Sequence, residues 1–272
     1  MKKIEILKKL SNIMKEDITH ITFDDLMYKD EKFFQESIKD DFAGWYIEND
    51  VLKKTEFILN NIDIKKGAEI LDVACGHGKF AQLLYESGYK VKGIDISETL
   101  IKYLNNKYES IVFIRSNMEN INFSKEFDLI LVLGNSLSLV SLGKAKISLE
   151  NFHRSLKPGG KIFLELDNKN YFIKNEANTK DWNQYQNRWI MFSEHIYRSR
   201  DCIEISRDIS IDIKENKIDQ YIIIKRLYNF IEIKNLLENS GFNICTAWGN
   251  WEGQLKEKGD LKPNLLLLAE KK

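Results

Sequence analysis

Short apolar runs alternate with segments of helical periodicity through the middle of this 272-residue chain. Apolar residues at helical spacing, such as Phe80, Leu83 and Leu84, indicate a helix with one buried face. Continuous apolar runs of five or six residues indicate buried strands. The pattern predicts strands near 69–74, 91–96, 111–115, 128–133 and 160–166, and helices near 50–61, 78–87, 98–106 and 144–156. Because strands and helices that alternate in this way form parallel sheets, we predict an α/β protein with a doubly wound, Rossmann-like sheet.

The C-terminal part of the pattern completes this sheet. A helix is predicted near 231–239, followed by strands near 242–249 and 264–270 that form a terminal hairpin. The sheet would then have seven strands, with the last one antiparallel. Since no linker interrupts the pattern, residues 1–272 are expected to form one domain, in which residues 1–50 supply a helical cover.

Residues 168–226 interrupt the alternation with a pattern of period two. Isoleucines at 203, 205, 209, 211 and 213 alternate with polar residues, as in a strand with one buried and one wet face. A polar turn at 214–217 leads back into a second strand. We predict an antiparallel β-ribbon inserted after the fifth strand. Ligands of open α/β sheets bind at the C-terminal edge of the strands, so the ribbon would lie there as a lid.

The first strand runs into a glycine turn that opens a helix. Gly76 and Gly78 let the backbone approach a ligand closely, and the second strand ends in an acid, Asp95. This arrangement is typical of nucleoside binding, in which the acid accepts from ribose hydroxyls. Residues 76–81 also satisfy the G-x-G-x-x-A dinucleotide fingerprint. Asp72 favours S-adenosylmethionine over NAD, because a carboxylate near the turn would suit an ammonium group and repel a pyrophosphate.

Four ordered segments carry a family resemblance. The turn from Asp72 to Gly78, the strand ending in Asp95, and the segments 127–136 and 156–163 resemble successive motifs of class I S-adenosylmethionine-dependent methyltransferases of small molecules. The resemblance covers about residues 45–170. The chain departs from the family at Ala74, where many members have a third glycine, and at Asn117, where members usually have aspartate. An asparagine oxygen can still accept from the adenine amino group.

The resemblance implies a set of cofactor-binding residues. Asp72 would orient the methionine ammonium group, Asp95 would bind the ribose, and Ile96 would pack on the adenine. The end of the fourth strand would lie beside the reactive methyl group. The implied set comprises Tyr46, Asp72, Ala74, Cys75, Gly76, Gly78, Asp95, Ile96, Asn117, Met118, Leu133 and Asn135.

No residue is assigned as the catalytic group from sequence, but five are candidates on the substrate side. Arg207 interrupts the isoleucine row, and it would bind an anionic substrate if that face overlooks the cleft. His195 lies in the segment that could cover the site. The candidates are Tyr46, Asn135, Asp167, His195 and Arg207. No metal is expected, because Asn135 replaces the aspartate that Mg²⁺-dependent O-methyltransferases need after strand four.

Composition narrows the partners. Lys plus Arg and Asp plus Glu both number 41, so no basic excess is available for a nucleic acid. The three cysteines are scattered and favour neither a disulfide framework nor zinc. The charged N-terminus resembles neither a signal peptide nor a membrane span. We therefore expect a cytoplasmic monomer or homodimer that acts on a small molecule, with no nucleic acid or membrane partner.

The predicted reaction is in-line methyl transfer from S-adenosylmethionine to a small-molecule acceptor. The sequence shows no obvious histidine–carboxylate dyad, which favours an amine over a hydroxyl acceptor, because an amine deprotonates more readily. Two alternatives remain open. One is a nicotinamide-dependent oxidoreductase on a Rossmann sheet, and the other is a non-catalytic S-adenosylmethionine-binding protein.

Overall fold

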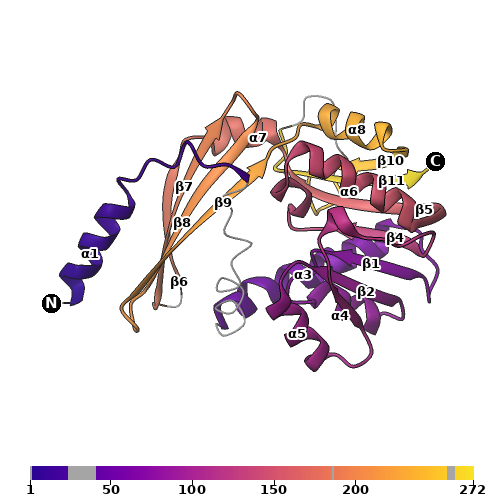
Figure 1. Ribbon diagram of the computed structural model, residues 1–272, viewed down its shortest axis with the longest axis horizontal. Coiled ribbons are helices and arrows are strands. Elements are labelled where there is room, and N and C mark those ends of the chain that lie inside the picture. The colour runs from indigo at the N-terminus through magenta and orange to yellow at the C-terminus, as the bar shows by residue number, and fades with distance from the viewer. Residues whose placement is uncertain (1, 24–40, 186, 256–260) are drawn as a thin grey trace.

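A seven-stranded sheet forms the centre of the protein (Figure 1). The computed structural model describes residues 2–23, 41–185, 187–255 and 261–272. The strand order is β10-β11-β5-β4-β1-β2-β3. The strands are β1 (Glu69–Val73), β2 (Lys90–Asp95), β3 (Val112–Arg115), β4 (Phe127–Val132), β5 (Leu156–Asp167), β10 (Phe242–Trp248) and β11 (Asn264–Lys271). β11 is antiparallel to β5 and β10, whereas the pairs among β1 to β5 are parallel. The predicted doubly wound sheet with an antiparallel last strand is confirmed.

Helices cover both faces of this sheet. One face packs against α3 (Asp41–Asn61), α4 (Lys79–Glu86) and α5 (Glu98–Lys107) through an apolar cluster. The other packs against α6 (Leu142–Ser155) and α8 (Phe230–Asn239) through a second cluster. Leu129, Leu131 and Ile130 of β4 are fully buried, and the alternating positions belong to different clusters. Burial on both faces explains why the strands read as continuous apolar runs.

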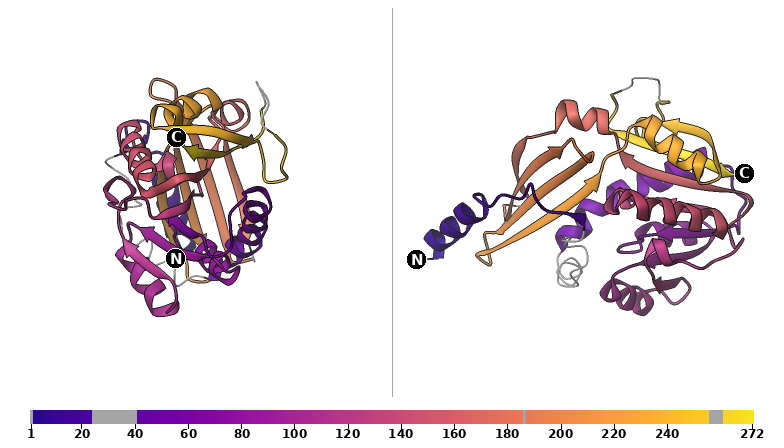
Figure 2. Two further views of the ribbon diagram at one scale, coloured as in Figure 1. Left: turned by 90° about the vertical axis from the view of Figure 1, so that its right-hand side faces the viewer. Right: turned by 45° about the horizontal axis from the view of Figure 1, so that its top comes forward.

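The predicted two-stranded insertion is part of a four-stranded antiparallel sheet. Its strands are β6 (Lys180–Tyr185), β7 (Trp189–Arg198), β8 (Ile203–Asp212) and β9 (Lys217–Arg226), in that order, preceded by α7 (Lys169–Asn175). This inserted sheet stands beside the seven-stranded sheet (Figure 1 and Figure 2). The two ends of the insertion meet: Asn168 forms a parallel bridge with Tyr228, and the Lys169 N–H donates to the Tyr228 carbonyl.

The N-terminal segment packs on the isoleucine face of the inserted sheet. α1 (Lys2–Ile13) lies at the far end of that sheet from the seven-stranded sheet (Figure 1). Ile13 packs with Ile209 and Ile211, and Ile18 packs with Ile203 and Ile205. Residues 2–23 therefore bury apolar side chains on this sheet, and the helical cover expected for residues 1–50 stays a prediction. Residues 24–40, which belong to the segment expected to supply this cover, lie outside the described residues.

Candidate functional site

A cavity of about 510 Å³ lies between the two sheets. One wall consists of residues that follow the C-terminal ends of β1, β2, β3 and β4, such as Gly76 and Asn117. The opposite wall is the polar face of the inserted sheet, including Glu204, Ser206 and Asp208 of β8. The face of β8 that alternation indicates as wet is thus the face toward the cavity. Its residues are nevertheless buried, with Glu204 1% and Ser206 3% exposed.

The turn after β1 folds tightly because it uses left-handed backbone conformations. Ala74, Gly76 and Gly78 have φ angles of 56°, 54° and 71°. A Cβ on Gly78 would lie 2.7 Å from Leu104 Cδ2, so only glycine fits there without displacement. Asp95, at the end of β2, fixes the turn: its Oδ2 accepts from the Gly76 N–H at 2.9 Å. Its Oδ1 accepts from the Ser97 N–H, also at 2.9 Å.

Two buried carboxyl groups lie at this turn. Burial and the neighbouring Asp95 carboxylate raise the pKa of Asp72 to about 7. Burial also raises the pKa of Asp95, against the effect of the backbone N–H groups of Ser97, Gly76 and Ile96. Among the described residues Asp72 Oδ2 has no hydrogen-bond partner, although it is shielded from solvent. A buried acid with one unpaired oxygen and an acidic neighbour favours a positively charged ligand at the turn.

The turns after β3 and β4 complete the cofactor side of the cavity. Asn117 caps the short 3₁₀ helix η3 (Met118–Asn120), and its side chain accepts from the Glu119 N–H. Gly134 and Asn135 both adopt left-handed conformations, with φ of 60° and 61°. The Asn135 side chain accepts from the Asp167 N–H, which joins the ends of β4 and β5.

Glu165 on β5 holds the β4 turn, and sequence reasoning missed it. This carboxylate is 5% exposed and accepts from the Gly134 N–H at 2.7 Å. It also accepts from Lys54 Nζ at 3.0 Å and from Trp251 Nε1 at 3.1 Å. The available signal was a lone acid inside an otherwise apolar strand, where an unpaired charge would be costly.

The structure brings most of the predicted cofactor residues to one cavity wall. Seven of them line it: Ala74, Gly76, Asp95, Ile96, Asn117, Met118 and Asn135. Four others belong to the adjoining strand ends and turn but are not on the wall: Asp72, Cys75, Gly78 and Leu133. Tyr46 lies in α3, which begins nine residues before the predicted position 50, and its side chain is outside the described residues.

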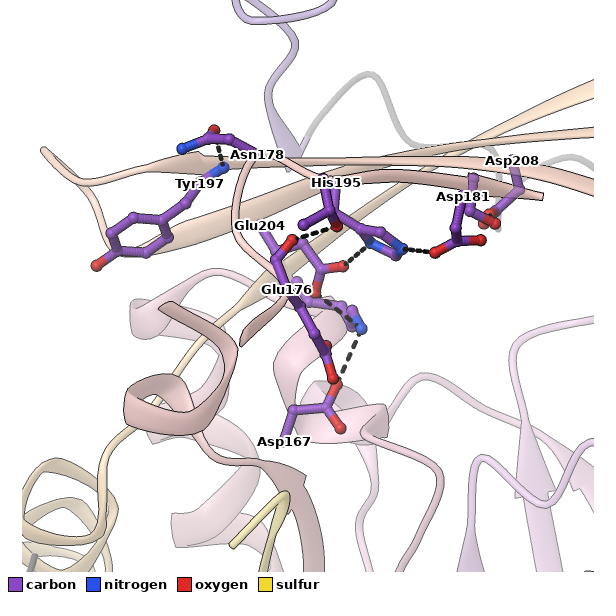
Figure 3. A network of polar contacts seen from close by, with 11 residues as sticks. Asp167, Glu176, Asn178, Asp181, His195, Tyr197, Glu204 and Asp208 are labelled. Carbon is purple, nitrogen blue, oxygen red and sulfur yellow. Dashed lines mark hydrogen bonds and ion pairs between the residues drawn. The ribbon is translucent and has the colours of Figure 1, made fainter. Parts of the chain in front are cut away.

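A polar network crosses from the seven-stranded sheet to the inserted sheet (Figure 3). Asp167, at the end of β5, pairs with Lys225 of β9, with Oδ2 and Nζ 2.9 Å apart. The Lys225 ammonium also pairs with Glu204 Oε2 at 2.8 Å. Glu204 Oε1 in turn lies 2.9 Å from His195 Nδ1, within hydrogen-bond distance. Lys225, Glu204 and His195 all line the cavity.

Charges in this network change the proton affinities of its members. The hydrogen bond to Glu204 raises the pKa of His195 above its ordinary value, in opposition to burial. Burial lowers the pKa of Lys225, but the Asp167 and Glu204 carboxylates outweigh it and leave that pKa raised. Burial raises the pKa of Asp208, which accepts from the Ser193 hydroxyl at 2.7 Å.

Two sequence interpretations need correction. Arg207 does not face the cavity: it is 2% exposed on the isoleucine face, where its guanidinium donates to the carbonyls of Ile13 and Glu16. Glu194 Oε2 lies 3.6 Å from its Nε. The expected absence of a histidine–carboxylate dyad is also wrong, because His195 and Glu204 form one on the cavity wall.

Two searches of the described residues bear on metals and membranes. No group of three or more His, Cys, Asp or Glu side chains is placed to hold a metal ion there. Within the same ranges, no helix combines the length and apolar character that a bilayer crossing requires.

The chain matches known methyltransferases in sequence and in fold. Residues 70–160 match the family model described as a methyltransferase domain. YqeM of Bacillus subtilis (strain 168), a methyltransferase candidate, is 32% identical over 102 residues, which are 36% of this chain and 41% of that protein. The chain thus spans less than half the length of this relative.

Two solved structures illustrate the similarity in fold. The CcbJ methyltransferase from Streptomyces caelestis has a TM-score of 0.72 and 14% identity, over 82% of this chain and 89% of that one. S-adenosylmethionine-bound CalS10, an amino pentose methyltransferase from Micromonospora echinaspora, has a TM-score of 0.64 and 14% identity, over 86% and 97%. Together with the glycine turn and its two acids, these matches show a methyltransferase domain over residues 70–160 and a fold similar to that of S-adenosylmethionine-dependent methyltransferases.

Proposed function

We propose that the protein transfers a methyl group from S-adenosylmethionine to a small-molecule amine that binds against the inserted sheet. The observation that carries this proposal is the composition of the cavity, which has the family's cofactor-binding turns on one wall and a buried polar sheet face on the other. A cavity of about 510 Å³ is in the range of small-molecule sites.

The chain's residues would bind and position both reactants. When bound, the cofactor supplies an electrophilic methyl group on a sulfonium sulfur. Asp95 would accept from the ribose hydroxyls, because its carboxylate can accept more hydrogen bonds than the neighbouring backbone N–H groups donate. Asp72 would accept from the methionine ammonium group, directly or through water. Positioning of this kind contributes up to about 7–11 kcal/mol to a displacement reaction.

The charge of the cavity supports an amine acceptor. Apart from Asp95, which is assigned to the ribose, three carboxylates line it (Glu119, Glu204 and Asp208) against two ammonium groups (Lys144 and Lys225), a formal charge of −1 with His195 neutral. Lys225 is already paired with two carboxylates, Glu204 and Asp167. The remaining acidic excess would attract a protonated amine and disfavour an anionic acceptor. The similarity in fold to an amino pentose methyltransferase agrees with this class.

The proposal is tested with the full chain in two steps. Calorimetry should show binding of S-adenosylhomocysteine and none of NADH. Incubation with methyl-tritiated S-adenosylmethionine and a panel of small amines, alcohols and phenols should then label amines. Binding without label in any product would indicate a non-catalytic cofactor-binding protein, and label confined to alcohols or phenols would contradict the amine assignment.

A further inference from the structure

We propose that His195, held by Glu204, is the base that removes the proton from the acceptor, and that Lys225 and Asp167 position Glu204. This inference rests on the proposed methyl transfer and assigns its proton acceptor. A continuous set of contacts joins Asp167 at the end of β5 to His195 on β7 (Figure 3).

The hydrogen-bond geometry fixes which imidazole nitrogen is available. A carboxylate can only accept, so His195 Nδ1 donates to Glu204 Oε1 at 2.9 Å. In the neutral ring Nε2 is therefore the basic nitrogen. The Asp181 carboxylate faces Nε2, but its Oδ2 lies 4.0 Å from this nitrogen, beyond hydrogen-bond distance. His195 lines the cavity with its side chain 23% exposed, so Nε2 can accept a proton from a bound molecule.

The same contacts place His195 on the side where transfer would occur. Asp167 follows β5, and its backbone N–H donates to Asn135 at the end of β4. Asp167 then holds Lys225, which holds Glu204. The Glu204 side chain is 1% exposed and is bound at both oxygens, so its direction toward His195 is fixed. Such a base–orienter pair is the arrangement that general-base catalysis requires.

The reaction balances without any further reagent. The ammonium form of the acceptor transfers a proton to His195 Nε2, which leaves a lone pair on nitrogen. That lone pair forms the N–C bond as the S–C bond breaks, and the S–C electron pair remains on sulfur. The imidazolium that results faces the Glu204 carboxylate and later releases its proton to solvent.

Charged groups on every neighbouring element act on His195. The charged or titratable groups around it are Asp181 on β6, Glu204 and Asp208 on β8, Lys225 on β9 and Glu176 after α7. Carboxylates predominate, and the pKa of His195 is raised. Because the base must be neutral, kcat should rise with pH through a limb above the ordinary histidine value of 6.5.

Ring NMR of the full chain measures this pKa without any acceptor, since the protein has only four histidines. His195→Gln assigns the signal. His195 should titrate above pH 6.5 in the unaltered protein and at lower pH in Glu204→Gln. An unchanged midpoint in Glu204→Gln would overturn the pairing.

Kinetics on the amine identified by the labelling panel test the catalytic role. His195→Gln should lower kcat about 10²–10⁴-fold, the usual contribution of a general base. S-adenosylhomocysteine affinity should stay within about twofold, which also reports that the variant is folded. His195→Ala should regain activity with added imidazole. His20→Gln, an exposed histidine in the segment that packs on the remote sheet face, should match the unaltered enzyme.

The outcomes separate the two proposals. If the unaltered protein labels no amine, the proposed function fails, and the NMR titration still decides the pairing. If it labels an amine and His195→Gln retains full kcat at every pH, the proton-acceptor role of His195 is overturned.

Discussion

At the scale of single residues, the cofactor turn is held by buried acids that are costly before the ligand arrives. Asp72 and Asp95 are 2% and 6% exposed and lie close enough for Asp95 to raise the pKa of Asp72. Burial of both carboxylates opposes folding of the empty protein, and a positively charged ligand offsets this cost. The site therefore exchanges stability for affinity.

Asp72→Asn should make this exchange visible. The pKa of Asp72 is about 7 in the folded protein against 3.8 for the free group, so the folded state holds the proton more tightly. The free energy of unfolding therefore falls as pH rises between about 4 and 7, by as much as about 4–5 kcal/mol at about 1.4 kcal/mol per pKa unit. Urea unfolding of the empty protein should show Asp72→Asn to be more stable at pH 8 than the unaltered protein, with a smaller difference at pH 5. Equal destabilisation at both pH values would contradict this account, and S-adenosylhomocysteine should bind the variant more weakly.

Asp95→Ala should lower the affinity for S-adenosylhomocysteine by about 1.5–3 kcal/mol, the scale of hydrogen bonds to a charged group. The change also leaves the Gly76 and Ser97 N–H groups without their acceptor. Calorimetry measures the loss, and circular dichroism checks the fold. Asp95→Asn keeps one acceptor oxygen and should lose less. Undiminished binding by the alanine variant would refute the ribose assignment.

At the scale of elements, strands buried on both faces could be located from the sequence, whereas exposed or half-buried strands could not. Strands of the central sheet are buried on both faces, so their apolar runs identified them to within a few residues. β6 is largely exposed and β7 is half-buried along its length, so neither showed a clear alternation. The sequence also predicted that the polar residues of β8 face solvent, whereas they line the cavity. Alternation distinguishes the two faces of a strand, but it does not show what covers each face.

The His195–Glu204 dyad depends on strand register, which composition does not reveal. His195 pairs with Ser206 across β7 and β8, and Glu204 is two residues further along on the same face. Such diagonal neighbours come into contact only once the hairpin fixes its register. Arg207 was misplaced for the same reason: its face was known to be apolar, but the N-terminal segment that covers it is about 190 residues away in sequence.

Gly93→Ala tests how closely β2 and β3 pack beneath the cofactor turn. A Cβ on Gly93 would lie 2.6 Å from Phe113 Cδ1 and 3.0 Å from Cys75 Sγ. We expect a loss of about 1–3 kcal/mol in the free energy of unfolding, typical of overpacking. Gly143→Ala in the first turn of α6 is the matched control, since no atom lies within 4 Å of its Cβ position. It should be neutral or stabilise by up to about 1 kcal/mol. Urea unfolding measures the free energy of unfolding of both variants, and an equal change in the two would contradict the packing explanation.

At the scale of the whole molecule, the inserted sheet is enclosed from two directions. Its polar face forms the cavity wall, and its isoleucine face is covered by the N-terminal segment. Arg207 links the inserted sheet to the N-terminal segment, because its guanidinium on β8 donates to the carbonyls of Ile13 and Glu16. Residues 2–23 therefore stabilise the inserted sheet on the face opposite the cavity, and none of these residues lines the cavity.

Arg207→Met should lower the free energy of unfolding by about 2–4 kcal/mol, because the carbonyls of Ile13 and Glu16 would lose this donor and Glu194 would lose one of its ion-pair partners. The affinity for S-adenosylhomocysteine should change less than twofold. Urea unfolding and calorimetry measure the two quantities, and limited proteolysis should cut the N-terminal segment faster in the variant. If the variant kept its stability but bound the acceptor more weakly, the result would instead support Arg207 as a substrate-binding residue in the cavity.

The meeting of Asn168 and Tyr228 has a consequence for how acceptor choice can diversify. The chain leaves the central sheet and re-enters it at neighbouring positions, so a substitute segment of another length or composition can begin and end there without rerouting the rest of the polypeptide. Under the proposed function, donor recognition and acceptor recognition would therefore be encoded in separable stretches of sequence. Grafting foreign insertions between these two residues offers a direct route to new acceptors on an unchanged donor platform.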